Sequence, residues 1–245
     1  MKLEINIPTE LSDITLRQYQ KFLKTQEQVK SMTELQCIMI EIFCNLRPDM
    51  AKLMNFNQVE KITAELTAMF NDTPPLVQRF TMNGVEYGFI PELDDMTLGE
   101  YIDLDTYISD IDSLQVAMNV LYRPIVHKHK HKYTIKDYDP TTKNAMLNMP
   151  LDAVLSSMFF FSEFRNGLIN NYPEIFDGGQ GDTTSSLSQF QSKYGWFHSI
   201  WALSGGDITK VKDITKLNMH ECLMMLAYIK DKNELEAKQI KNNIR

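Results

Sequence analysis

A helix-starting phrase occurs twice in this chain and constrains the fold more than any other feature. Residues 11–19 read LSDITLRQY and residues 93–101 read LDDMTLGEY. In both copies a Thr stands three residues before a Gln or Glu. This is the spacing of a capping box, in which the hydroxyl and the longer side chain each bind a backbone amide at a helix start. We therefore predict that Thr15 and Thr97 cap helices. A weaker third copy places Asn218 three residues before Glu221 and predicts another cap.

Several segments carry apolar residues every three or four positions, which is the spacing of a helix with one buried face. The helices predicted on this basis start at Thr15 and cover 33–45, 57–70, 110–122, 151–169, 187–203 and 219–240. The charged stretch 230–245 is expected to be the solvated end of the last helix. The chain is therefore expected to be mainly helical.

The clearest β signal is Asn83-Gly84, the pair that a type I′ hairpin turn requires, between alternating segments that span 78–90. The segment Leu3–Ile7 alternates apolar and polar residues and is expected to be a strand that joins this hairpin. Pro124 is expected to break a helix, and 125–135 then indicates a second, more exposed hairpin. The predicted fold class is α+β, predominantly α-helical, with two small β-hairpins and an N-terminal strand.

A polar, glycine-rich segment at 177–186 has no apolar anchor and is expected to be a flexible loop. It would join a helical domain with a small antiparallel sheet, 1–176, to a C-terminal helical segment, 187–245. A chain of 245 residues can equally bury its apolar side chains in one large domain. Both arrangements stay open from the sequence.

Composition limits the kinds of molecule that the protein is expected to bind. A formal net charge of −7 gives no electrostatic reason to expect nucleic acid. The longest apolar stretch, 158–161, is too short to span a bilayer, and the N-terminus lacks the apolar run of a signal peptide. Cys37, Cys44 and Cys222 have no metal-type spacing, which favours reduced thiols in a cytoplasmic protein. We expect no membrane, no metal and no cofactor.

His127, His129 and His131 alternate with lysines, so in a strand the three imidazoles would share one face. Three readings are open: a solvated edge hairpin, a metal site, and a contact with an anion or phosphate. The first is favoured because lysines commonly protect an exposed strand edge. The familiar hydrolase, zinc-protease and dinucleotide-binding motifs do not occur in the sequence. We therefore expect that the protein is not an enzyme.

Large apolar side chains gather near the C-terminus. On a helix, Phe197, Ile200 and Trp201 would share one face, and Met224 and Met225 on the next helix could extend it. Aromatic residues of this kind dominate both protein cores and interface hot spots. The chain also has 15 Met, a residue that fills irregular core gaps and lines adaptable binding surfaces. These five residues are the candidate partner-binding surface, with core packing as the alternative.

Several phrases together resemble a family of small tailed-bacteriophage morphogenesis proteins. They are the segments 13–22, 87–91 leading into 96–104, 117–124, and 150–152 with 158–161. Members are described as tail assembly chaperones or virion-associated proteins. The resemblance implies a non-enzymatic protein that binds other phage structural proteins of the tail or capsid. It would act in the host cytoplasm during assembly, or in the virion, with its oligomeric state open. An assembly chaperone is the first reading; the alternative is a structural virion component from the neck, baseplate or internal capsid. No catalytic residue can be carried over.

Overall fold

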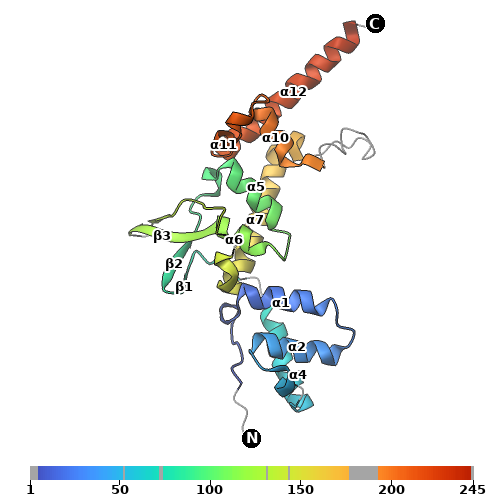
Figure 1. Ribbon diagram of the computed structural model, residues 1–245, viewed down its shortest axis with the longest axis vertical. Helices are drawn as coiled ribbons and strands as arrows, with labels where there is room; N and C mark the ends of the chain where they lie inside the picture. The colour runs from blue at the N-terminus through green and yellow to red at the C-terminus, as the bar shows by residue number, and fades with distance from the viewer. Residues whose placement is uncertain are drawn as a thin grey trace. The chain divides into compact units, whose positions relative to one another are not determined.

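The computed structural model describes residues 5–51, 53–71, 74–130, 132–142, 144–176 and 193–243 (Figure 1). In these residues helices predominate and the strands form a small antiparallel sheet, which confirms the predicted mainly helical α+β class. The chain divides into two compact units. Unit 1 comprises Met1–Pro91 and Thr106–Phe160, and unit 2 comprises Glu92–Asp105 and Phe161–Arg245. The segment 177–186 lies outside the described residues, so the predicted linker and the domain division drawn there stay predictions.

Unit 1 contains most of the helices predicted in the first half of the chain. They are α1 (Leu16–Gln26), α2 (Met32–Phe43), α3 (Pro48–Ala51), α4 (Phe56–Met69) and α6 (Leu114–Leu121), with the 3-10 helices η1 (Leu11–Asp13) and η3 (Ala145–Asn148). α7 (Leu151–Asn171) belongs to unit 1 as far as Phe160 and to unit 2 beyond it. The apolar faces of α1, α2 and α4 meet through aromatic rings. Phe43 lies 5.1 Å from Phe22 and 5.6 Å from Phe70, measured between ring centroids.

The sheet lies in unit 1 and has the order β1-β2-β3-β4, all antiparallel. The strands are β1 (Arg79–Met82), β2 (Val85–Phe89), β3 (Tyr122–His129) and β4 (Lys132–Ile135). Asn83 and Gly84 both have positive φ, at 52° and 75°, as the type I′ turn requires. Both predicted hairpins therefore form, and they join into one sheet because β2 pairs with β3.

Two expectations about the sheet need correction. Ile5–Ile7 has no strand in the structure, and Leu3 and Glu4 lie outside the described residues. β3 supplies the third strand instead, because the chain passes directly from α6 into an extended segment at Tyr122. Pro124 therefore lies within a strand rather than ending a helix. Its missing N–H is tolerated since the pairing with β2 ends at this residue, and an irregularity in the pairing with β4 follows between Ile125 and His127.

Tyr122 of β3 is the centre of an aromatic cluster on the sheet. Its ring is fully buried and lies 5.2 Å from that of Phe80 and 5.3 Å from that of Phe89. Phe89 in turn makes an edge-to-face contact with Phe160 of α7. The Tyr122 hydroxyl donates a hydrogen bond to the Val77 carbonyl oxygen at 2.7 Å. The buried phenol therefore keeps a hydrogen-bond partner.

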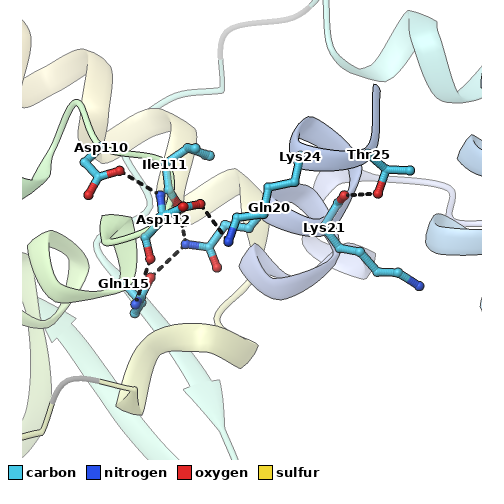
Figure 2. Close-up of polar contacts among 8 residues, drawn as sticks. All are labelled: Gln20, Lys21, Lys24, Thr25, Asp110, Ile111, Asp112 and Gln115. Atoms are coloured by element: carbon cyan, nitrogen blue, oxygen red, sulfur yellow. Dashed lines mark hydrogen bonds and ion pairs between the residues drawn. The ribbon is translucent and has the colours of Figure 1, made fainter. Parts of the chain in front are cut away.

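A buried amide holds α1 against the segment that precedes α6 (Figure 2). Gln20 is 7% exposed, and its Nε2 donates to the Ile111 carbonyl at 2.6 Å and to Gln115 Oε1 at 2.7 Å. At the surface of the same contact, Lys24 Nζ lies 2.7 Å from Asp112 Oδ1. Because the polar groups of a buried amide must be paired, Gln20 fixes the position of α1 more specifically than an apolar residue would.

The regular secondary structure in the described residues of unit 2 is helical, apart from one isolated β-bridge. Its elements are η2 (Leu93–Asp95), α5 (Leu98–Tyr107, of which the last two residues belong to unit 1), α8 (Pro173–Phe176), α10 (Trp196–Leu203), η4 (Ile208–Lys210), α11 (Val211–Ile214) and α12 (Met219–Asn243). α10 and α12 lie where helices were predicted, and residues 187–192 of the first prediction lie outside the described residues. Leu98, Ile200 and Cys222 form a buried cluster that brings α5, α10 and α12 together.

All three predicted helix caps are present. Gln18 N donates to Thr15 Oγ1 at 3.3 Å, and Thr15 N donates back to the Gln18 side chain at 2.9 Å. The capping box at Thr97 has the same two bonds, at 3.2 and 2.8 Å. Asn218 Oδ1 accepts from His220 N at 2.8 Å and so caps α12. The repeated phrase therefore starts α1, α5 and α12.

Each unit also joins two helix starts through the backbone. In unit 1, Thr15 pairs with Pro150: Leu16 N donates to Met149 O at 3.0 Å and Leu151 N to Ile14 O at 2.9 Å. In unit 2, Thr97 pairs with Asn218 by the equivalent bonds, each 2.9 Å. We call these two pairings the helix-start bridges. They satisfy backbone groups at the beginning of each helix that have no partner within it.

Candidate functional site

The aromatic pair Phe197 and Trp201 lies on the exposed side of α10. Their rings stack with centroids 6.2 Å apart and an angle of 25° between the planes. Phe197 is 47% exposed and Trp201 is 40% exposed. The Trp201 ring also lies over Gly206, where an added Cβ would be 3.5 Å from the ring. Two large apolar rings are thus held in a fixed arrangement and remain accessible to a partner.

Ile200, the third residue predicted for this surface, lies in the core. It is buried and packs with Leu98 and Cys222. A helix turns by about 100° per residue, so Ile200 and Trp201 face different directions although they are neighbours. Ile200 positions α10 and cannot contact a partner directly.

Met224 and Met225 are both on the exposed side of α12. They are 63% and 50% exposed, while Met219, Cys222, Leu223 and Leu226 on the same helix are buried. Tyr228 and Leu235, 62% and 57% exposed, follow at helical spacing from the two methionines. We call these four residues the α12 stripe: Met224, Met225, Tyr228 and Leu235. At 1.5 Å per residue the stripe is roughly 17 Å long.

The structure therefore separates the five predicted surface residues into three groups. Phe197 and Trp201 are in contact with each other, Ile200 is buried, and Met224 and Met225 belong to the α12 stripe. α10 packs against α12, and this contact uses the buried sides of the two helices. Sequence reasoning missed both residues: Leu235 lies within the charged stretch 230–245, and Tyr228 lies just before it. Their spacing from Met224, four and eleven residues, is the signal that could have found them.

Polar contacts hold α10 in place beside the aromatic pair. Trp196 Nε1 donates to Asp105 Oδ2 at 3.1 Å, and Arg165 Nε donates to Asp105 Oδ1 at 2.7 Å. The carboxylate of Asp105 raises the pKa of Arg165 further, chiefly through this hydrogen bond. The Trp196 ring also meets the fully buried Tyr101 edge to face at 5.5 Å. Trp196 thus orients α10 so that Phe197 and Trp201 face outward.

The start of α12 carries a second polar cluster. His220 Nε2 lies 2.8 Å from Asp94 Oδ1, and His220 Nδ1 lies 3.2 Å from the Tyr172 hydroxyl. Asn218 Nδ2 donates to the Asp94 carbonyl at 2.8 Å. Both ring nitrogens of His220 are engaged by neighbouring side chains. The arrangement fastens the first turn of α12 to η2, beside the helix-start bridge of unit 2.

Among the described residues, no group of three His, Cys, Asp or Glu side chains is placed to hold a metal ion. His127 and His129 are exposed on β3, and His131 lies outside the described residues. Cys37, Cys44 and Cys222 are free thiols. Burial raises the pKa of Cys44 to about 11, which makes this thiol a poor nucleophile at neutral pH.

Within the described part of the chain, no helix has the length and apolar character needed to cross a bilayer. Comparison with known proteins found no matching family model, no similar curated protein and no similar solved structure.

Proposed function

We propose that this protein is a non-enzymatic bacteriophage morphogenesis protein that acts by binding other phage structural proteins, most simply as a tail assembly chaperone. The phage assignment rests on the resemblance of the sequence phrases described above. The binding role rests chiefly on one observation, the α12 stripe. Four large apolar side chains lie along one side of a helix whose opposite side is buried in unit 2 as far as Leu226. A partner with an exposed apolar helix would cover them.

The composition of the stripe suits an adaptable surface. Met224 and Met225 have unbranched, flexible side chains that can repack against partners of different shape. Tyr228 adds a large amphipathic ring of the kind enriched in interfaces. Beyond Tyr228 the exposed side of α12 is mostly polar, with Lys232 and Glu236 forming an ion pair at 3.8 Å. An apolar strip with charged neighbours is the pattern expected of a helix that pairs with another helix.

The α12 stripe can be tested by changing it without disturbing the helix. In the variant Met224→Gln, Tyr228→Gln, Leu235→Gln, three of the four apolar side chains of the stripe are replaced while most of the helix propensity is kept. The full-length variant and the wild type would each be used to capture the phage structural proteins expressed from the same genome. We expect the wild type to retain a tail or capsid protein and the variant to lose it.

A matched control replaces three exposed apolar side chains elsewhere. Met32, Leu53 and Phe56 are 73%, 80% and 61% exposed, and all belong to unit 1. Their triple replacement by Gln should leave capture intact. If the control loses the partner as strongly as the stripe variant, the α12 stripe is not the binding surface. If the wild type captures no phage structural protein, the proposed function is wrong.

The chaperone role and the alternative of a virion component differ in where the protein ends up. A chaperone leaves its partner before the particle is complete, whereas a neck, baseplate or internal capsid protein stays. Mass spectrometry of purified particles distinguishes them. We expect the chain to be depleted from particles and present in lysates with its partner. Stoichiometric recovery from particles would favour the structural role.

A further inference from the structure

The ribbon formed by the outer halves of β3 and β4 is strongly basic, in contrast to the rest of the chain. From Tyr122 to Lys136 the sequence contains Lys, Arg and His but no Asp or Glu, although the whole chain has a net charge of −7. β2 pairs with β3 only between Tyr122 and Pro124. Beyond this point the described part of β3 pairs with β4 alone, as a two-stranded ribbon (Figure 1).

The two faces of the ribbon have different surroundings. Lys128 and Tyr133 are cross-strand partners and share one face. On this face Lys128 forms an ion pair with Glu86 of β2, and the Tyr133 hydroxyl donates to the Phe89 carbonyl at 2.7 Å. These contacts hold the ribbon to the body of the sheet. One side of the ribbon is therefore used for attachment.

The other face is exposed and carries only donors and cations. His127 pairs with Thr134 and His129 pairs with Lys132, so all four side chains lie on the face opposite Tyr133. All four residues are exposed, as is Lys130, which starts the turn with a φ of 53°. Lysine, imidazole and hydroxyl groups can each donate a hydrogen bond to a phosphate oxygen.

We propose that this outer face of the ribbon binds the phosphate backbone of double-stranded DNA. A two-stranded β-ribbon fits the major groove of B-form DNA, which is about 12 Å wide, whereas the major groove of double-stranded RNA is too deep and narrow. The overall negative charge led to the expectation that nucleic acid is not a partner. That expectation averages over the whole chain, while binding depends on the local charge at the contact. This inference does not rest on the proposed function.

The test measures binding of full-length protein to a fluorescent DNA duplex by anisotropy, at salt concentrations from 50 to 200 mM. If Lys130 and Lys132 each neutralise one phosphate, the affinity of the wild type should fall roughly tenfold over this range. The ribbon variant is Lys130→Asn, Lys132→Gln. Asn accepts a positive φ, so the turn is kept while the charge is removed. In this variant the slope of log affinity against log salt should be shallower by about two.

The control is Lys21→Gln, Lys61→Gln, which makes the same change in net charge on two exposed helical lysines of unit 1. It should bind DNA like the wild type. Equal losses in the control and the ribbon variant would show that the ribbon is not the site. Absence of wild-type binding at 50 mM salt would overturn the proposal. Binding to immobilised polyglutamate but not to DNA would overturn it in favour of an acidic protein partner. Equal affinity for duplex RNA would overturn the groove argument.

Discussion

Thr97 and Asn218 are backbone partners that each also cap a helix. The pairing places the starts of α5 and α12 side by side in unit 2, and Thr15 and Pro150 place the starts of α1 and α7 side by side in unit 1. At each of the four bridging positions, Thr15, Pro150, Thr97 and Asn218, the preceding residue donates its N–H to the carbonyl of the residue three positions before it. The same local geometry therefore occurs four times in the chain.

Loss of a single cap should weaken unit 2 measurably. Replacing Thr97 by Ala removes the oxygen that accepts from Glu100 N, and we expect the free energy of unfolding to fall by about 1 kcal/mol. Urea denaturation followed by circular dichroism measures this difference. Thr97→Ser keeps the hydroxyl and should stay close to the wild type. An Ala variant as stable as the wild type would mean that the cap contributes nothing.

Two neighbours on α12 should respond very differently to truncation. Leu223 is fully buried, so Leu223→Ala should cost about 2–5 kcal/mol through lost packing and a cavity. Met224 is 63% exposed, and Met224→Ala should change stability by no more than about 0.5 kcal/mol. Thermal unfolding of both variants checks this. Similar losses for the two would show that Met224 is covered, and that the α12 stripe is not a free surface.

Alanine should have opposite effects at two glycines. At Gly88 an added Cβ would overlap the Tyr133 ring, with Cδ2 at 2.9 Å, and we expect a loss of about 1–3 kcal/mol. Gly167 lies inside α7 with no atom within 4 Å of an added Cβ, and its replacement should stabilise the fold by about 0.4–1 kcal/mol. Chemical denaturation of each variant gives both values. Equal stability of the Gly88 variant and the wild type would contradict the close packing of Tyr133.

The fold should lose stability at alkaline pH. Burial raises the pKa of Tyr101 and of Tyr122 above the ordinary tyrosine value of 10.0. Below pH 10 both phenols are protonated in the folded and the unfolded chain. Above pH 10 the unfolded chain releases these protons and the folded chain keeps them, so unfolding becomes more favourable as the pH rises. Absorbance at 295 nm should show the two buried phenols ionising only when the protein unfolds. Their ionisation in the folded protein near pH 10 would contradict this.

Local signals in the sequence were sufficient to predict most of the helices and strands. Thr15, Thr97 and Asn218 identify helix starts because a cap depends on residues only three positions away. Asn83 and Gly84 identify a hairpin for the same reason, since only a few residues accept positive φ at both turn positions. Such features require no knowledge of the tertiary structure.

Features that depend on residues far apart in the chain could not be predicted from local signals. The alternation at Ile5–Ile7 is compatible with a strand, but β3 is the strand that pairs with β2. Pro150 starts a helix and forms a bridge like Thr15, yet it has no capping side chain and so did not stand out as a copy of the phrase. Within the candidate surface, periodicity grouped Ile200 with Phe197 and Trp201. It could not show which side of α10 is covered by Leu98 and Cys222.

The helix-start bridges also limit how early each unit can complete its folding during synthesis. Arg17 and Asn148, which meet beside the first bridge, are 131 residues apart, and Asp94 and Asn218 beside the second are 124 apart. During synthesis the backbone groups at the starts of α1 and α5 must therefore wait for partners that emerge much later. Each unit is also assembled from two separate stretches of chain. No single proteolytic cut can then release either unit whole.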